Sequence, residues 1–244
     1  MIIAIVNQKG GVGKTTTTLG LARSLAKQQP VLVVDIDPLA AATDELFTHV
    51  AHRPARTVAD VLAGRCTIEC ALYGAEDNIR LLPGSDDMED VVTDLAADET
   101  GILRLRTLLA ERNELVLIDC PAGLNALTLS AVIAADLIVV ATIPEKWAVK
   151  GARKVLAQVT DVREALGFAP QIVGVVATMV RPTIQHRHWL VELAAQTDMP
   201  FLGSIPLRGG RDSRRQLAAD YDNLVLAYGR LFTGQAFGFE HKEQ

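Results

Sequence analysis

The sequence has little cysteine, no long hydrophobic run and no overall excess of positive charge, and each of these shortages excludes a class of protein. Three cysteines in 244 residues are too few for a disulfide framework, so we expect a reducing, cytoplasmic location. The most apolar stretch, 129–143, is interrupted by Asp136, which argues against a membrane span. Because no basic region or cleavage site precedes the first apolar run, we expect no signal peptide. The formal net charge of −5 argues against a protein built wholly around nucleic acid.

Hydrophobic residues nevertheless make up 49% of the chain, which is enough for a sizeable core and excludes a disordered chain. Short, almost wholly apolar runs alternate with longer segments of helical period, and this alternation predicts an α/β fold. The strands are expected at 2–6, 31–35, 115–119, 137–141 and 172–177. The helices are expected at 15–28, 102–112, 148–166 and 184–196. We therefore predict a doubly wound, mostly parallel sheet flanked by helices, in one domain that spans residues 1–244.

A glycine-rich segment, NQKGGVGKTT at 7–16, connects the first predicted strand to the first predicted helix. Three glycines in four positions allow the backbone to wrap closely around an anion, and the helix that follows presents its positive end to the same anion. Lys14 is placed to contact the β- and γ-phosphates of a nucleotide, and the Thr15 hydroxyl is placed to bind Mg²⁺. The predicted phosphate site consists of Gly10, Gly11, Val12, Gly13, Lys14, Thr15 and Thr16. A glycine-rich turn without a ligand does not explain why Lys-Thr follows the last glycine.

Acidic residues stand at the ends of two predicted strands. Asp35 and Asp37 come at the end of 31–35, and Asp119 ends the apolar run 115–119. The carboxyl ends of strands in open α/β sheets face the ligand crevice, so these side chains should approach the phosphates. Asp119 has the Walker B form, in which the carboxylate holds the Mg²⁺ shell. The alternative for Asp35 and Asp37 is that they only end the strand and cap the next helix.

An additional lysine, Lys9, gives the glycine-rich loop the form KGGxGK[ST]. This form resembles the deviant Walker A motif of the ParA/MinD family of P-loop NTPases, and in particular the ParA/Soj-type partition ATPases. The resemblance implies that Lys9 reaches across a nucleotide-sandwich dimer to the partner's phosphates. Together with Lys14, it would then stabilise the charge that develops during hydrolysis, as an arginine finger does.

The resemblance also assigns roles beyond the loop. Asp37 would orient or polarise the attacking water, and Asp35 would belong to the Mg²⁺ site or support it. Pro206 would lie against the adenine. The family's glutamine after the proline is Leu39 here, a departure that bears on hydrolysis and on the contacts of this segment but not on nucleotide binding.

Positive charge is concentrated between residues 181 and 215, although the whole chain is acidic. This stretch holds six arginines against three acidic residues. Four of the arginines fall within eight residues, namely Arg208, Arg211, Arg214 and Arg215. On spacing alone, such a run is most often a solvated face with local ion pairs. The resemblance implies instead that this region binds double-stranded DNA non-specifically when the protein is dimeric with ATP.

Two further residues border the predicted site. Cys120 follows Asp119 directly, and Trp147 follows a predicted strand and stands beside Lys146. We expect both Cys120 and Trp147 to pack in the core. The alternative for Trp147 is a position flanking the ligand crevice.

The function that the resemblance implies is that of a cytoplasmic, nucleoid-associated ATPase. It would bind Mg·ATP, form an ATP-dependent homodimer, bind DNA non-specifically and release it on slow hydrolysis that a ParB-like partner stimulates, thereby driving plasmid or chromosome partition. A MinD-like regulator that cycles on membranes is the alternative, but it requires a basic amphipathic C-terminal helix, whereas 232–244 holds two acidic residues and one lysine. We therefore expect no membrane partner. A third possibility is a cobyrinate-synthase-like or nitrogenase-iron-protein-like relative, and the latter would need cluster-binding cysteines at strand ends.

Overall fold

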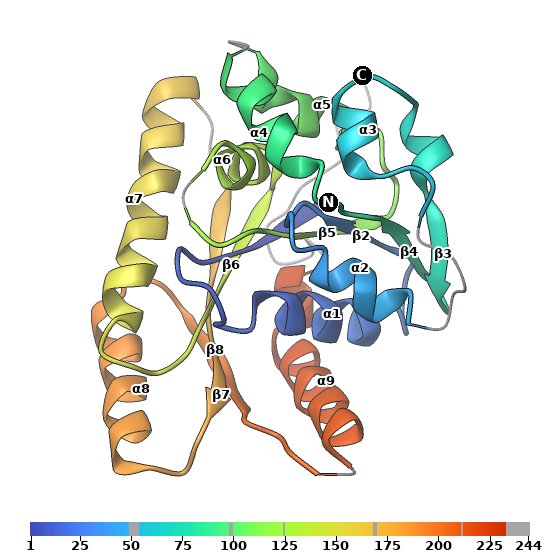
Figure 1. Ribbon diagram of the computed structural model, residues 1–244. Coiled ribbons are helices and arrows are strands. Elements are labelled where there is room, and N and C mark those ends of the chain that lie inside the picture. The colour runs from blue at the N-terminus through green and yellow to red at the C-terminus, as the bar shows by residue number, and fades with distance from the viewer. Residues whose placement is uncertain (49–53, 98–99, 124, 168–169, 211, 233–244) are drawn as a thin grey trace.

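The computed structural model describes residues 1–48, 54–97, 100–123, 125–167, 170–210 and 212–232, and its centre is an eight-stranded sheet (Figure 1). From edge to edge the strand order is β3-β4-β2-β5-β1-β6-β7-β8, and neighbouring strands are parallel except for β3 and β4. The strands are β1 (Ile2–Val6), β2 (Val31–Asp35), β3 (Tyr73–Glu76), β4 (Ile79–Leu82), β5 (Leu115–Asp119), β6 (Leu137–Thr142), β7 (Gln171–Val180) and β8 (Phe201–Pro206). The predicted α/β fold with a mostly parallel sheet is confirmed.

The central strands are buried along their whole length. Every residue of β1, β2, β5 and β6 is buried, because helices cover both faces of the sheet. Strand β1 lies between β5 and β6, so the strand order reverses around it. The loops that leave the carboxyl ends of these strands diverge at such a point, which is where open α/β sheets bind their ligands.

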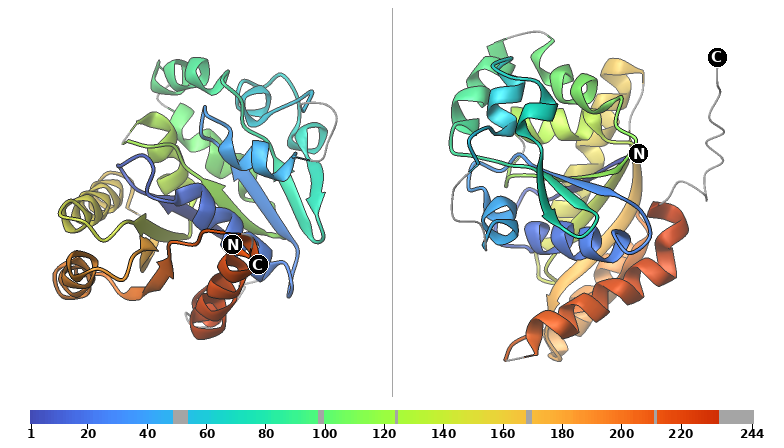
Figure 2. Two further views of the ribbon diagram at one scale, coloured as in Figure 1. Left: turned by 60° about the horizontal axis from the view of Figure 1, so that its bottom comes forward. Right: turned by 90° about the vertical axis from the view of Figure 1, so that its right-hand side faces the viewer.

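Two layers of helices enclose the sheet (Figures 1 and 2). Helices α1, α2 and α9 pack on one face and α3 to α7 on the other, while α8 packs against α7. The helices are α1 (Lys14–Leu25), α2 (Ala41–Leu46), α3 (Val58–Leu62), α4 (Met88–Ala97), α5 (Arg104–Leu109), α6 (Ala126–Ala134), α7 (Ala148–Leu166), α8 (Ile184–Gln196) and α9 (Ser213–Phe232), with 3₁₀ turns at Ile68–Ala71 and Gly101–Leu103. None of the helices in the described ranges combines the length and apolar character that a membrane span requires.

Helix α1 is held against α9 by an unusually close contact. Gly20 faces the ring of Tyr221, and a Cβ at Gly20 would lie 2.2 Å from that ring. The hydroxyl groups of Thr17 and Tyr221 are 3.0 Å apart and form a buried hydrogen bond. Because α1 begins at the glycine-rich loop, this packing fixes the position of the helix end at which the phosphate site is predicted.

Candidate active site

The glycine-rich loop joins β1 to α1. Gly11 and Gly13 have φ angles of 69° and 81°, in the left-handed region that favours glycine. A Cβ on Gly13 would also lie 3.2 Å from the side chain of Thr178, so the loop passes close to β7. The first N–H groups of a helix have no acceptors within the helix, so the loop and the start of α1 together offer backbone donors to an anion.

Side chains from neighbouring strands hold the loop in this shape. The Thr178 hydroxyl on β7 donates a 2.6 Å hydrogen bond to the carbonyl oxygen of Val12. The side-chain amide of Asn7 donates to the Ala141 carbonyl on β6 (2.7 Å), and its oxygen accepts from the backbone N–H of Lys9 (3.0 Å). Asn7 begins the glycine-rich segment, but no role was predicted for it or for Thr178. The loop is therefore preorganised before any ligand binds.

The predicted phosphate-binding lysine, Lys14, lies in the first turn of α1 and is only 7% exposed. Its ammonium donates a 3.3 Å hydrogen bond to the carbonyl oxygen of Lys9, and within the described part of the chain no carboxylate pairs with it. A buried cation is costly without compensating negative charge. This environment suits a lysine whose counter-ion is a phosphate group.

The predicted Mg²⁺ ligands Thr15 and Asp119 lie in direct contact although 104 residues separate them. The Thr15 hydroxyl donates to Asp119 Oδ2 over 2.7 Å, and the Thr18 hydroxyl donates to Oδ1 over 2.9 Å. Asp119 ends β5 and is fully buried. Burial, and then the nearby charge of Asp35, raise the pKa of Asp119 to about 7, although the two hydroxyl donors oppose this shift. A divalent cation would relieve the cost of the buried carboxylate.

The segment after β2 is organised around Asp35. Asp35 Oδ2 accepts from both the backbone N–H and the hydroxyl of Thr43, each over 2.8 Å, and Oδ1 accepts from the backbone N–H of Asp37. The Thr43 oxygen in turn accepts from the backbone N–H of Gly84 (2.8 Å). Burial raises the pKa of Asp35 to about 6. Both carboxylate oxygens of Asp35 already accept hydrogen bonds from its own chain, so Asp35 is suited to hold this segment in place beside the site. Its role as a metal ligand stays a prediction.

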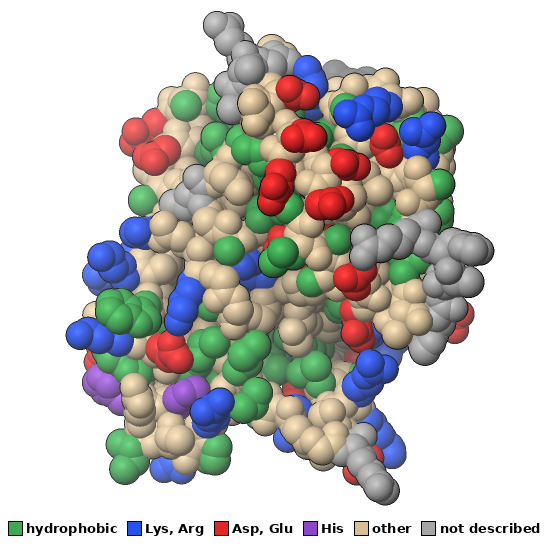
Figure 3. Space-filling model, in the orientation of Figure 1, with side chains coloured by type: hydrophobic (Ala, Val, Ile, Leu, Met, Phe, Trp, Pro, Cys, Tyr) green, Lys and Arg blue, Asp and Glu red, His purple; other side chains and the backbone are tan. Residues whose placement is uncertain are grey.

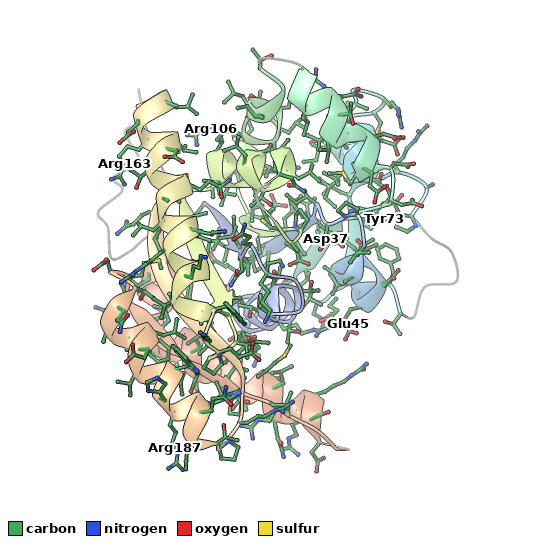
Figure 4. The ribbon with its side chains drawn as sticks, turned by 60° about the vertical axis from the view of Figure 1, so that its left-hand side comes forward. Asp37, Glu45, Tyr73, Arg106, Arg163 and Arg187 are labelled. Atoms are coloured by element: carbon green, nitrogen blue, oxygen red, sulfur yellow. The ribbon has the colours of Figure 1, made fainter. Side chains whose placement is uncertain are left out.

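Asp37 is more accessible than Asp35 and lies in the loop before α2. Figure 4 shows it near the middle of the molecule, beside the ends of the central strands. Its Oδ1 accepts a hydrogen bond from the backbone N–H of Leu39 (3.0 Å), and its other oxygen remains available to a ligand or a water molecule. This position is compatible with the predicted role of Asp37 in orienting water, which stays a prediction.

The additional lysine of the loop, Lys9, forms an ion pair with Glu145 of its own chain. The Lys9 ammonium and Glu145 Oε2 are 3.0 Å apart, and both side chains are exposed. Both residues line a cavity of about 260 Å³ beside the glycine-rich loop. An exposed ion pair contributes little stability, so Lys9 can exchange this partner for another anion at little cost. Glu145 belongs to no motif and was not predicted.

Comparisons with known proteins agree with this geometry. A family model described as "AAA domain" matches residues 1–172. The chromosome-partitioning ATPase Soj of Thermus thermophilus is 38% identical over 178 residues, which cover 72% of this chain and 68% of that protein. The chain belongs to the ParA/Soj family of ATPases. The family that the glycine-rich loop resembles is thus confirmed.

Solved structures share the fold of this chain over almost its whole length. Cobyrinic acid a,c-diamide synthase from Mycobacterium smegmatis, solved with ADP and magnesium, superposes with a TM-score of 0.85 at 28% identity and covers 96% of both chains. A plasmid partition protein from Borrelia burgdorferi, bound to AMPPNP, superposes with a TM-score of 0.81 at 22% identity, covering 94% of this chain and 98% of that one. The second likeness concerns the fold alone.

Pro206, which the ParA/Soj resemblance places against the adenine, ends β8. It pairs in register with Val180 of β7, and the backbone N–H of Leu207 donates to the Val180 carbonyl (2.9 Å). Strand β7 also carries Thr178, which contacts the glycine-rich loop. Pro206 therefore lies at the carboxyl ends of the strands, as the loop does, and its contact with a base stays a prediction.

The arginines assigned to DNA differ in their surroundings. Arg208 makes two hydrogen bonds to Asp220 of α9, of 2.7 and 2.6 Å, so its charge is already compensated. Arg214 is 83% exposed and lies 3.9 Å from one carboxylate oxygen of Glu45, and Arg215 is also exposed. Arg211 lies outside the described residues. Arg214 and Arg215 are thus better suited than Arg208 to contact a phosphate backbone.

Trp147 does not pack in the core, and this prediction was wrong. The residue directly precedes α7 and is 58% exposed, with the Lys146 ammonium 5.7 Å from the centre of its ring. The helix begins only at Ala148, so the indole projects from the end of the β6–α7 loop instead of from a face that the sheet covers. Cys120, in contrast, is fully buried, as predicted.

Proposed function

We propose that this chain is a partition ATPase whose nucleotide state controls its binding to DNA. The observation that carries the proposal has two parts. Thr15 and Asp119 are hydrogen-bonded to each other at the start of α1, and a second lysine, Lys9, is exposed in the same glycine-rich loop. The relatives named as partition ATPases support the same conclusion. ATP and Mg²⁺ are the ligands for which this site is built.

The residues present fit a bound Mg²⁺. Thr15 and Asp119 offer a hydroxyl and a carboxylate within 2.7 Å of each other, and oxygen donors of this kind are those that Mg²⁺ prefers. When bound, Mg²⁺ neutralises charge on the β- and γ-phosphates. The backbone N–H groups of the loop and the Lys14 ammonium hold the phosphate oxygens, and Asp37 orients the water that attacks the γ-phosphate.

Lys9 links hydrolysis to dimerisation in this proposal. Two copies would sandwich two nucleotides, and Lys9 of each copy would leave Glu145 to contact the phosphates held by the other. The released carboxylate is exposed to solvent, so the exchange carries little penalty. ATP would thus stabilise the homodimer, and slow hydrolysis, stimulated by a ParB-like partner, would dissolve it.

DNA would bind to the dimer through exposed arginines such as Arg214 and Arg215. A dimer presents two such sets to one duplex, and the second set then binds at a high effective concentration. The monomer, with a formal net charge of −5, would bind weakly. In the cell this behaviour would place the ATP-bound dimer on the nucleoid. The tail that bears on the membrane-cycling alternative, 233–244, lies outside the described residues.

We also propose that residues 1–244 act as one P-loop domain. The sheet takes strands from residue 2 to residue 206, and both helical layers pack on it. A single cooperative unfolding transition, followed by both circular dichroism and tryptophan fluorescence, is the expected result. Two separated transitions would contradict it.

Gel retardation of a random-sequence duplex, run beside sedimentation with anionic lipid vesicles, tests the function. Retardation with ATP and Mg²⁺ that weakens steeply with salt, without sedimentation, is the expected result. Binding that does not depend on ATP, or no binding at all, would overturn the partition function. Co-sedimentation with vesicles would favour the membrane-cycling alternative, and ATP hydrolysis without either would favour a metabolic enzyme such as the Mycobacterium smegmatis structural relative.

A further inference from the structure

Two large apolar side chains are exposed in the loops that follow β2 and β6, two strands that lie on either side of the β5–β1 pair in the sheet. Leu39 is 81% exposed and follows the Asp37-Pro38 segment, whereas Trp147 is 58% exposed and follows Glu145 by two residues. Exposed apolar side chains are common when they are single. These two are unusual because of their neighbours: Leu39 lies two residues after Asp37, which is assigned to catalysis, and Trp147 lies two residues after Glu145, the ion-pair partner of Lys9.

The backbone presents Leu39 to the outside. Asp37 Oδ1 accepts from the N–H of Leu39 over 3.0 Å, and the Asp37 carbonyl accepts from the N–H of Ala40 over 2.8 Å. Ala40 has a φ of 50°, in the left-handed region that residues other than glycine rarely adopt. This turn fixes Leu39 at its apex, so the exposure of the side chain is part of the local structure.

The two side chains stand in surroundings of opposite charge. Trp147 borders the cavity of about 260 Å³ that Lys9, Lys150 and Lys154 also line. Leu39 borders a second cavity, of about 240 Å³, whose lining includes Asp44 and Asp86. Figure 3 shows acidic side chains gathered over the upper part of one face and Lys and Arg gathered at its left, over the lower half of α7. The three lysines that line the cavity beside Trp147 outnumber its one acid, Glu145, whereas the charged residues that line the cavity beside Leu39 are acidic.

Symmetry brings these surfaces together in the dimer of the proposed function, on which this inference rests. If Lys9 reaches the phosphates held by a second copy, the residues around Lys9 approach the residues around that copy's phosphates. On one side these include Glu145 and Trp147, and on the other Asp37 and Leu39. A two-fold axis makes every such contact occur twice.

We propose that Leu39 of each copy packs against the partner's Trp147 in the ATP-bound dimer, with the lysines near Trp147 facing the acidic residues near Leu39. The occupant of this surface is a second copy of the chain. The contact removes two exposed apolar side chains per copy from water, and it is absent from the monomer. The leucine at the position where the family carries glutamine then has a function in association and not in chemistry.

Cysteine cross-linking tests this contact directly. In a chain with Cys66→Ser and Cys70→Ser, and with the buried Cys120 retained, Leu39→Cys and Trp147→Cys are introduced together. With Mg²⁺ and a non-hydrolysable ATP analogue, mild oxidation should give a covalent dimer, and with ADP it should not. Leu226→Cys with Trp147→Cys is the control, since Leu226 is equally exposed, at 86%, but lies on α9.

Fluorescence and sedimentation provide a second test without cysteines. In a Trp189→Phe chain, Trp147 is the remaining tryptophan, and its emission should shift to shorter wavelength when the ATP analogue induces dimerisation. Leu39→Ser should weaken the dimer about tenfold or more, and Leu226→Ser should leave it unchanged. If the ATP analogue makes wild type dimeric, but the cysteine variant gives no cross-link and the Trp189→Phe variant gives no emission shift, this contact alone is overturned. If wild type stays monomeric with the ATP analogue, the proposed function and this contact both fail.

Discussion

The Thr15 hydroxyl on α1 donates a 2.7 Å hydrogen bond to Asp119 Oδ2 at the end of β5. This bond joins the first turn of the phosphate-binding helix to the centre of the sheet, and it places two oxygen ligands of the kind that Mg²⁺ prefers side by side. Asp119 is buried there with a pKa raised to about 7, so the fold holds a costly buried carboxylate at the proposed Mg²⁺ site.

Replacing Asp119 by asparagine should stabilise the nucleotide-free protein while it abolishes Mg²⁺-dependent ATP hydrolysis. The folded protein binds the Asp119 proton more tightly than the unfolded chain does, since the pKa rises from 3.8 to about 7. The stability of wild type should therefore fall as the pH rises from about 4 to about 7, and level off above that range. Asp119→Asn removes this loss, which amounts to roughly 2–4 kcal/mol above pH 7.

Urea unfolding of both proteins across this pH range measures the effect. Asp35, whose pKa is raised to about 6, adds a smaller loss of stability of the same sign to both proteins, over a narrower pH range. The pH-dependent part of the difference in the free energy of unfolding between wild type and Asp119→Asn should vanish at the acidic end, where the carboxyl group is protonated in both the folded and unfolded states. If the free energy of unfolding changes with pH by the same slope in the two proteins, Asp119 is not held as a costly buried carboxylate.

Thr178→Val should weaken nucleotide binding without touching the predicted phosphate contacts. The variant leaves the Val12 carbonyl without its 2.6 Å donor, so we expect a loss of about 1–2 kcal/mol in the free energy of unfolding and a several-fold lower affinity for ATP. Thr160→Val is the matched control, because its hydroxyl bonds a carbonyl on the exposed side of α7. Calorimetric titration with ATP distinguishes the two; identical affinities would mean that the loop does not need this anchor.

Lys9→Ala should leave ATP binding nearly intact but reduce hydrolysis about tenfold or more, because the charge that stabilises the partner's γ-phosphate is lost. Stability should change by less than about 1 kcal/mol, since the Lys9–Glu145 pair is exposed. Lys27→Ala, which removes a lysine paired with Asp222, is the control. Full activity of Lys9→Ala in a steady-state ATPase assay would refute its role across the dimer.

The exposed arginines and the paired one should behave differently. Replacing Arg214 and Arg215 by alanine should spare nucleotide binding and reduce the slope of log affinity for DNA against log salt by about 2 or more. Arg208→Ala should mainly lower stability, because Asp220 loses its partner, and should change the slope less. A salt titration of DNA affinity separates these outcomes, and an unchanged slope for the double variant would place the DNA elsewhere.

Much of the fold could be predicted because its central strands are buried on both faces. Strands β1, β2 and β5 have the predicted bounds, and so do α7 and α8. Strands β3, β4 and β8 were not predicted: β3 and β8 are half exposed, and β8 includes Gly203, Ser204 and Pro206, so the uninterrupted apolar run is missing. Helix α9 was also not predicted, because polar residues fill much of it.

Some residues of the candidate site could likewise be predicted from the sequence, and others could not. Lys14, Thr15 and Asp119 carry motif signals, because a glycine-rich loop and an apolar strand ending in aspartate are patterns of adjacent residues. Thr178 meets the loop from 166 residues away, a relationship that no local pattern encodes. Trp147 was misplaced because its type suggests a core position, whereas its position one residue before α7 directs it to solvent.

Analytical ultracentrifugation of a fluorescently labelled duplex with this chain tests whether the bound nucleotide controls DNA binding, since it reports the protein's association and its DNA binding in one experiment. With ATP and Mg²⁺, the proposed function predicts dimers that carry the labelled DNA and release it as salt is raised. With ADP it predicts monomers and free DNA. DNA carried equally by both nucleotide states, or an ATP-bound protein that stays monomeric and leaves the DNA free, would contradict it.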